Sequence, residues 1–135
     1  RMTDASTRFP VSVKGVLFMG GRVVLLRNER DEWELPGGRL EPGEDPRRCL
    51  EREMAEELSI AATAGAILDC WLYEVLPGRE VVIVSYGCTS AATDLQLSPE
   101  HKAVGRFRLD ELAALAMPEG YRRSIRAWAN LRAST

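Results

Sequence analysis

The stretch that begins at Gly38 and ends at Ile60 constrains the fold of this 135-residue chain most, because it joins a glycine loop to a helix. Asp45 and Pro46 mark the start of that helix. Asp accepts hydrogen bonds from the free N–H groups of a helix N-terminus, and Pro suits the first helical position because its missing N–H costs nothing there. We therefore predict a helix that ends at Leu58 or Ser59.

Two arcs of side chains lie next to each other on this helix. At 100° per residue, an apolar arc about 80° wide borders an acidic arc about 100° wide. The apolar arc holds Leu50, Met54 and Leu58, and the acidic arc holds Glu53, Glu56 and Glu57. Because like charges three and four residues apart destabilise a helix, more so beside a core, a cation should compensate. Arg52 can orient these carboxylates but cannot neutralise them alone.

A hard divalent metal is the natural compensator. Oxygen ligands without Cys or His nearby select Mg²⁺ or Mn²⁺ over zinc, and Mg²⁺ characteristically joins a few carboxylates to substrate phosphate oxygens. The glycines before the helix let backbone groups approach such a complex closely. Water activated by the metal or by a free glutamate could then attack phosphorus. The alternative is a solvated acidic face, which is the commoner role of glutamate-rich helices.

The complete spacing resembles the Nudix box of the Nudix (MutT-like) hydrolases. That box reads glycine, five residues, Glu, seven residues, then Arg-Glu-aliphatic-any-Glu-Glu-any-Gly-aliphatic. The matching residues are Gly38, Glu44, Arg52, Glu53, Met54, Glu56, Glu57 and Ile60. Ser59 replaces the last glycine of the box, which ends the helix where φ > 0 is common. A Ser in that conformation costs on the order of 1 kcal/mol, unless the helix ends by another geometry.

The resemblance implies a fold and a set of roles. Residues 33–38 are similar to the family's approach to the loop, and residues 100–125 to its C-terminal pattern. The implied fold is the Nudix α/β/α sandwich with a mixed central β-sheet. Glu56 and Glu57 would be metal ligands, and Glu53 a further ligand or the general base. Which glutamate is the base stays open.

The rest of the chain predicts strands on both sides of the helix and a second helix at the end. Apolar β-branched runs at residues 11–19 and 22–28 are joined by Gly20-Gly21, which predicts a hairpin. Further strands are expected at residues 33–35, 66–76, 80–89 and 103–109, and a loop at Pro36-Gly37-Gly38. A helical turn or two is expected at residues 110–115, and Pro118 opens the last helix. Its apolar stripe is Tyr121, Ile125, Trp128 and Leu131. This order indicates an α/β sandwich.

Several residues outside the helix are candidates for the site. Glu100 stands where many Nudix enzymes carry an extra ligand or base, although it could be a surface carboxylate. His101, the single histidine, is more plausibly a solvated loop residue than a base. Gly37 could offer its carbonyl to the metal. Arg27 could contact a phosphate.

Substrate binding is expected to involve Arg27, Gly38, Glu44 and Trp33. Trp33 or Tyr73 could stack on a base, but aromatic residues in strands are more often core. The basic residues Arg122, Arg123 and Arg126 lie opposite the apolar stripe of the last helix. We expect them to form a solvated face and not a nucleic-acid surface.

Composition excludes some classes of protein. The net charge of -2 gives no general attraction to nucleic acid or acidic membranes, and no apolar run approaches the roughly 20 residues of a membrane span. Three widely spaced cysteines argue against a disulfide framework and favour the cytoplasm. We expect one domain over residues 1–135, with a flexible segment at residues 1–8. A homodimer is possible only by analogy.

The sequence therefore predicts a Mg²⁺-dependent hydrolase that cleaves a diphosphate linkage in a small nucleoside diphosphate derivative. Nucleoside triphosphates, ADP-ribose-like sugars and dinucleoside polyphosphates all stay open as substrates. The alternative is a non-catalytic Nudix-fold module that senses a nucleotide metabolite. Loss of box glutamates would favour the sensor, and all four are present.

Overall fold

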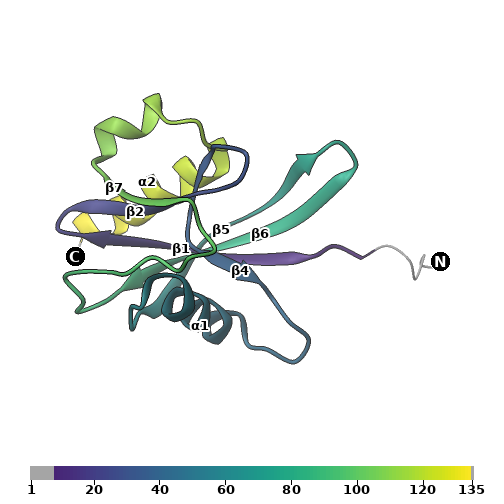
Figure 1. Ribbon diagram of the computed structural model, residues 1–135, viewed down its shortest axis with the longest axis horizontal. Coiled ribbons are helices and arrows are strands. Elements are labelled where there is room, and N and C mark those ends of the chain that lie inside the picture. The colour runs from purple at the N-terminus through teal and green to yellow at the C-terminus, as the bar shows by residue number, and fades with distance from the viewer. Residues whose placement is uncertain (1–7, 135) are drawn as a thin grey trace.

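The computed structural model describes residues 8–134 and shows a β-sheet between two helices (Figure 1). The elements are β1 (Val11–Met19), β2 (Arg22–Arg27), β3 (Trp33–Glu34), β4 (Gly37–Arg39), α1 (Pro46–Leu58), β5 (Thr63–Leu76), β6 (Arg79–Thr89), β7 (Ala103–Phe107), the 3-10 helix η1 (Leu109–Ala114) and α2 (Glu119–Ala133). Helix α1 covers one face of the sheet, and α2 with η1 covers the other. This is the predicted α/β/α sandwich.

The sheet is mixed, as predicted. Its strand order is β3-β2-β1-β6-β5, with β4 also pairing to β1 and β7 to β2. Only the β1–β6 pair is parallel, among the pairs of the described residues. Strands β5 and β6 form a long hairpin that projects beyond the helices (Figure 1).

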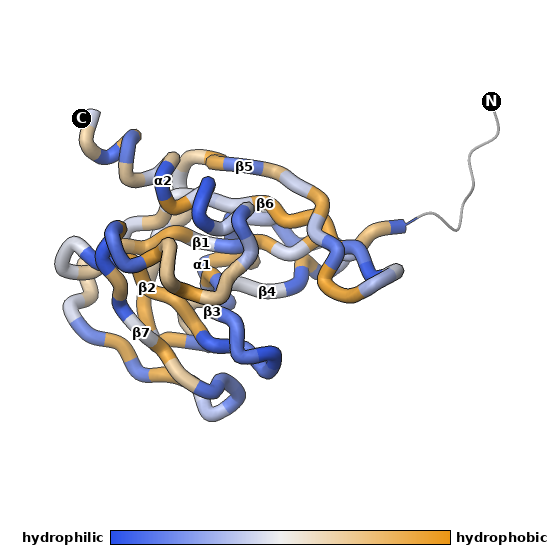
Figure 2. The backbone as a smooth tube through the Cα atoms, turned by 90° about the horizontal axis from the view of Figure 1, so that it is seen from above, coloured by the Kyte–Doolittle hydropathy of each residue, from blue (hydrophilic) through white to orange (hydrophobic). Residues whose placement is uncertain are grey.

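Two hydrophobic cores lie on the two faces of the sheet. Because successive strand residues point to opposite faces, neighbouring residues of β2 divide between the cores. Val24 and Leu26 pack with the α1 side, whereas Val23 and Leu25 pack with the α2 side. Figure 2 shows the resulting hydrophobic colour along β1 and β2 in the middle of the fold.

Strand β4 corrects the prediction of a loop at Pro36-Gly37-Gly38. The first half of β1 pairs with β4 through Ser12, Val13 and Lys14, while its second half pairs with β2. The pairing is non-local, and two glycines carry little strand propensity, so no local pattern predicts this strand. Its consequence is that the glycines are held against β1, directly beside α1.

Helix α1 begins and ends as predicted. The side chain of Asp45 accepts a hydrogen bond from the backbone N–H of Arg48 at 3.2 Å, and Pro46 is the first helical residue. Ser59 adopts the left-handed conformation, with φ 57° and ψ 40°, and its N–H donates to the carbonyl of Ala55. The serine thus takes the conformation expected of the family glycine.

The end of the chain departs from the prediction at two residues. Leu131, expected in the buried stripe of α2, is 47% exposed, whereas Tyr121 and Ile125 are buried. Arg122, expected on a solvated face, instead donates hydrogen bonds to the carbonyls of Leu112, Leu115 and Met117. The segment around η1 wraps over this arginine, which helix periodicity alone does not reveal.

Two expectations concern membrane-spanning segments and the N-terminal segment. None of the helices within residues 8–134 is both long and apolar enough to cross a bilayer. The flexible segment expected at residues 1–8 falls, apart from Arg8, outside the described residues.

Candidate active site

The three glutamates of the acidic arc differ in their burial along the edge of α1. The side chains of Glu57 and Glu53 are 11% and 19% exposed, whereas that of Glu56 is 60% exposed. The predicted position beside the core is therefore confirmed for two of them. Burial of two anions near each other is unfavourable unless something positive joins them.

Glu57 is held at the innermost position. One carboxylate oxygen accepts a hydrogen bond from the backbone N–H of Gly37 at 3.0 Å. Burial raises the pKa of Glu57 to about 7, although Lys14 and the Gly37 N–H act in the opposite direction. A cation at this carboxylate would relieve the cost of its ionisation.

Glu53 lies against Gly38. A Cβ atom at Gly38 would come within 2.0 Å of Oε2 of Glu53, so a side chain here would displace the carboxylate. Burial raises the pKa of Glu53, the charge of Arg52 opposes this, and nearby Glu56 adds to it. The glycine of the loop and the glutamate of the helix thus fit together as one unit.

Arg52 fixes the outer carboxylates. Its guanidinium donates two hydrogen bonds to Glu44, at 2.8 and 3.1 Å, and a third to Glu56 at 3.1 Å. The hydrogen bonds from Arg52 lower the pKa of Glu44 to about 2. Glu44 is therefore engaged by Arg52, and Arg52 joins the loop before α1 to the helix.

The loop that precedes β7 reaches the same cluster. The N–H of Ser98 donates to the main-chain carbonyl of Glu57 at 2.8 Å, and Nε2 of His101 lies 3.4 Å from the carboxylate of Glu57. Nδ1 of His101 is buried without a hydrogen-bond partner among the described residues. The sequence placed this histidine in solvent, and no local pattern marked its contact with α1.

Arg27, Glu100 and His101 line one pocket of about 230 Å³ beside Glu34. Arg27 lies 3.6 Å from Asp31, so it is partly engaged by a local ion pair. The structure therefore places two expected site residues in the same pocket. They are Arg27, expected to contact a phosphate, and Glu100, expected to be an extra ligand or base.

The two aromatic candidates occupy different places. Trp33 packs edge-on against Phe107, with ring centroids 4.8 Å apart, at the margin of the core on the α2 side. Tyr73 contacts Trp71 and Tyr121 but also lines a small pocket with Lys14. Core packing thus accounts for Trp33 more fully than for Tyr73.

Lys14 is a site residue that the sequence did not mark. It lies on β1 opposite Gly37, is only 8% exposed, and its ammonium is 3.9 Å from Glu34. Burial lowers the pKa of Lys14, but Tyr121, Glu34, Glu57 and Glu53 outweigh this and raise it. The useful signal was a lysine within an otherwise apolar strand.

The donor set suits a hard divalent metal. Within residues 8–134, no group of three or more Asp, Glu, His or Cys side chains is arranged to hold a metal ion by itself. Mg²⁺ does not need one, because it commonly takes one or two carboxylates together with waters and substrate phosphates. Glu53 and Glu57, with Glu56 at the solvent side, are the oxygen donors of this edge of α1 that could take part in such a site.

Comparison with known proteins agrees with this geometry. A family model described as NUDIX domain matches residues 8–128. The CTP pyrophosphohydrolase of Escherichia coli (strain K12) is 38% identical over 97 residues, which are 68% of this chain and 70% of that protein. The 8-oxo-dGTP diphosphatase of Proteus vulgaris is 35% identical over 63 residues, 47% of this chain and 55% of that protein.

The fold is shared with solved structures. A MutT protein from Methanosarcina mazei Go1 superposes with a TM-score of 0.80 at 23% identity, over 96% of this chain and 99% of that one. The chain spans about half of the length of several relatives found by sequence. The family match nevertheless extends over nearly all described residues, and the chain therefore belongs to the NUDIX domain family.

Proposed function

We propose that the chain is a Mg²⁺-dependent hydrolase, able to use Mn²⁺, that cleaves a diphosphate linkage in a nucleoside diphosphate derivative. Water attacks a phosphorus atom held at the acidic edge of α1. The relatives named as pyrophosphohydrolase and diphosphatase support this class of reaction. The single observation that carries the proposal is that buried Glu57 and half-buried Glu53 each lie against one of the two glycines of β4.

Each residue has a distinct role in this proposal. Glu53, Glu56 and Glu57 bind the metal, with the Gly37 carbonyl as a further candidate ligand. A divalent metal held by these residues would supply a Lewis acid for the diphosphate and would lower the pKa of water. Arg52 positions Glu56 and also holds Glu44, so it acts through the glutamates and not on the substrate.

The general base is Glu53 or Glu100 in this proposal. Glu53 lies on the acidic edge of α1, where the metal is proposed to bind. Glu100 lies on the loop before β7, and the next residue, His101, contacts Glu57. A base must reach the water directly or through one further water. The pocket that Glu100 shares with Arg27 and His101 supports its access to a bound phosphate.

The second candidate function is a sensor that binds a nucleotide without hydrolysing it. Its distinguishing feature would be an incomplete acidic edge. All four box glutamates are present, and each is contacted by Arg52 or by a backbone N–H. This favours catalysis.

Turnover across a panel of substrates tests the proposal. Nucleoside triphosphates, ADP-ribose-like sugars and dinucleoside polyphosphates are incubated with Mg²⁺ or with EDTA, and released phosphate or pyrophosphate is measured. Metal-dependent turnover of one class supports the hydrolase. Thermal stabilisation by one compound with no turnover of any would instead indicate the sensor.

The expected partners follow from the same site. A small nucleotide derivative is the proposed substrate. We still predict neither a nucleic-acid nor a membrane partner. The choice between a monomer and a homodimer stays open. Free Cys49, Cys70 and Cys88 are in keeping with a cytoplasmic location.

A further inference from the structure

A second hollow beside the site has an unusual charge. A cleft of about 540 Å³ between the start of β1, β4 and the β5–β6 hairpin joins a pocket of about 130 Å³ that reaches Lys14. The basic residues along both are Arg8, Lys14, Arg30, Arg39 and Arg79, and the acidic ones are Glu34 and Glu80. The lining is thus positive, although the chain carries a net charge of -2.

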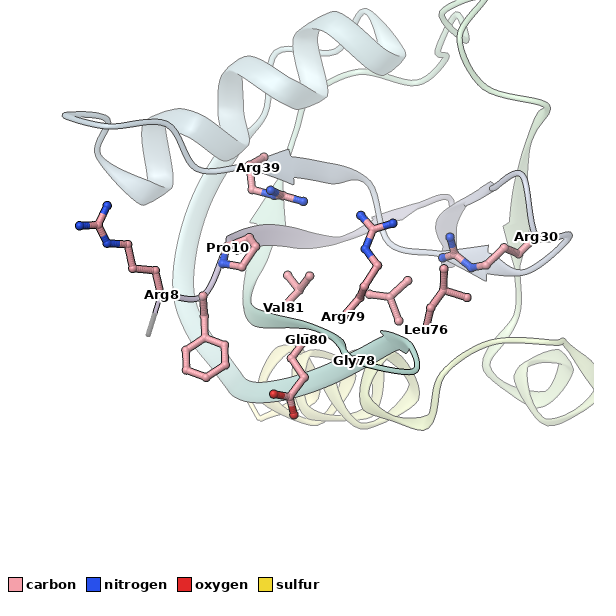
Figure 3. A pocket seen from close by; sticks show the side chains of 11 residues that line it. Arg8, Pro10, Arg30, Arg39, Leu76, Gly78, Arg79, Glu80 and Val81 are labelled. Atoms are coloured by element: carbon pink, nitrogen blue, oxygen red, sulfur yellow. The ribbon is translucent and has the colours of Figure 1, made fainter. Parts of the chain in front are cut away.

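Arginines of this cleft converge on one space. Figure 3 shows Arg39 from β4, Arg79 from the β5–β6 hairpin and Arg30 from the β2–β3 loop pointing toward the hollow, while Glu80 points away. Among residues 8–134, neither Arg39 nor Arg79 has an acidic side chain within ion-pair distance. By contrast, Arg106 and Arg123 each have an acidic partner at 3.1 and 3.3 Å.

The acidic residues of the lining do not balance this charge. Glu34 is already engaged, because Lys14 lies 3.9 Å from it and Asn28 donates to it at 3.2 Å. A guanidinium is planar and presents paired N–H donors that fit phosphate or carboxylate oxygens. Arg30 is paired with Glu32 at 3.3 Å, whereas Arg39 and Arg79 converge without an acidic partner among the described residues and therefore favour an anionic ligand.

The cleft lies next to the acidic edge of α1, where the metal is proposed to bind. Arg39 directly follows Gly38, which packs against Glu53, and Lys14 is opposite Gly37 in the register of β1 and β4. A substrate whose diphosphate lies at Glu53 and Glu57 can therefore extend toward Arg39 and Arg79. The aromatic residues of the lining are Phe9, Tyr73 and Tyr121, and the two tyrosines pack against each other.

We infer that the preferred substrate carries a second anionic group, a phosphate or a carboxylate, on one of the two moieties that the hydrolysed diphosphate joins. Arg39 and Arg79 bind this group, Arg30 adds positive charge beside it, and Lys14 faces the connecting segment. The inference rests on the proposed function for the placement of the diphosphate. It names a substrate class: diphosphate derivatives with such a charged moiety, in preference to their uncharged counterparts.

Matched pairs of compounds test the inference. NADPH with NADH and coenzyme A with dephospho-coenzyme A differ by a phosphate, whereas UDP-glucuronate with UDP-glucose differ by a carboxylate. The ratio of kcat/KM within each pair is measured for the wild type, Arg39→Ala, Arg79→Ala and the control Arg22→Ala. Arg22 is an exposed residue at the start of β2, beyond the hairpin turn at the other end of β1.

We expect the charged member of at least one pair to be preferred by about tenfold or more, as charge-assisted hydrogen bonds allow. Arg39→Ala and Arg79→Ala should each remove most of that preference, and Arg22→Ala should keep it. The pair that shows the preference identifies phosphate or carboxylate. Equal turnover of both members in every pair would overturn the inference and leave the hydrolase proposal standing.

Calorimetry in EDTA separates the two proposals, because it measures binding without turnover. Tighter binding of the charged member, lost in Arg79→Ala, supports the inference even if no compound is hydrolysed. Absence of any difference in binding and in turnover contradicts it. Binding confined to an oligoribonucleotide with a terminal triphosphate would also contradict it, because the cleft would then serve a nucleic acid.

Discussion

Gly38 and Glu53 occupy adjoining space, such that a Cβ atom on the glycine would lie 2.0 Å from Oε2 of the glutamate. The glycine lies on β4 and the glutamate on α1, and the pairing of β4 with β1 holds the two together. The glycine of β4 and the glutamate of α1, both residues of the Nudix-box spacing, are thus in steric contact. The position of the carboxylate depends on the missing side chain.

Gly38→Ala should lower activity while leaving stability almost unchanged. The added methyl group meets only the flexible end of Glu53, which can rotate away. A displacement of this size at a catalytic group costs roughly 100-fold in kcat/KM, whereas Gly→Ala in a compatible conformation changes stability by only about 1 kcal/mol or less. Kinetics and urea denaturation of the same preparation check both parts.

Gly37→Ala is the matched comparison. Gly37 has φ 146°, and a Cβ atom there would lie 1.9 Å from the carbonyl oxygen of Val13, which is backbone and cannot rotate away. This variant should lose more than about 1 kcal/mol of stability. If Gly38→Ala lost as much stability as Gly37→Ala, or kept full activity, the steric account would be wrong.

Glu57 should make the metal-free protein less stable as pH rises. Its pKa is about 7 in the folded chain, against 4.5 as the ordinary value. Below the ordinary value both states are protonated. Between pH about 4.5 and about 7, Glu57 keeps its proton in the folded state but has lost it in the unfolded state. The free energy of unfolding therefore falls as pH rises through this range, by up to about 3 kcal/mol in total.

Urea denaturation in EDTA at several pH values measures this effect. The difference in unfolding free energy between the wild type and Glu57→Gln should change between pH about 4.5 and about 7 and level off above. Gln cannot titrate, so the variant removes only this contribution. A difference that stays constant across this window would show that Glu57 titrates normally.

Arg52→Lys should reduce activity and raise the Mg²⁺ concentration needed for half-maximal rate. Lysine keeps the charge but cannot make the paired hydrogen bonds to Glu44 while also reaching Glu56. Loss of a group that orients metal ligands typically costs about 10- to 100-fold in activity or metal affinity. Arg48→Lys on the same helix is the control, because its side chain is 81% exposed. Equal kinetics of the two variants would argue against a positioning role.

Local signals explain how much of the fold was predictable. Asp45 and Pro46 lie at the start of α1, and the apolar stripe lies within it, so one stretch of sequence defined both its bounds and its buried face. Ser59 was unresolved between two geometries, because only the packed structure decides whether the left-handed strain is tolerated. Strand β4 was missed because its partner lies elsewhere in the chain.

The same distinction holds for the site. The acidic edge of α1 was predictable because helix periodicity places Glu53 and Glu57 beside the core. Lys14 and His101 were not, because their contacts with Glu34 and Glu57 join segments far apart in sequence. The sequence also did not distinguish Arg39 from the many surface arginines of the chain, because all of them carry the same charge.

Arg122→Met should destabilise the fold without affecting turnover. The variant leaves the carbonyls of Leu112, Leu115 and Met117 without the donor they have now. Unpaired partly buried carbonyls should cost about 2–3 kcal/mol in total. Arg126→Met is the control, since it shares the partner Glu119 but is 54% exposed and should cost less than about 1 kcal/mol. Equal thermal shifts of the two would indicate that Arg122 is merely a surface residue.

We infer that α1 carries carboxylates whose crowding a metal relieves during catalysis. The most direct test measures Mg²⁺-dependent turnover and Tm in EDTA for Glu53→Gln, with Glu51→Gln on the same helix as control. We predict that Glu53→Gln loses at least about 100-fold in kcat while its Tm holds or rises, because repulsion with Glu56 is relieved. Glu51→Gln should keep its kcat. Undiminished turnover of Glu53→Gln, or a fall in its Tm that accounts for the lost activity, would contradict the account.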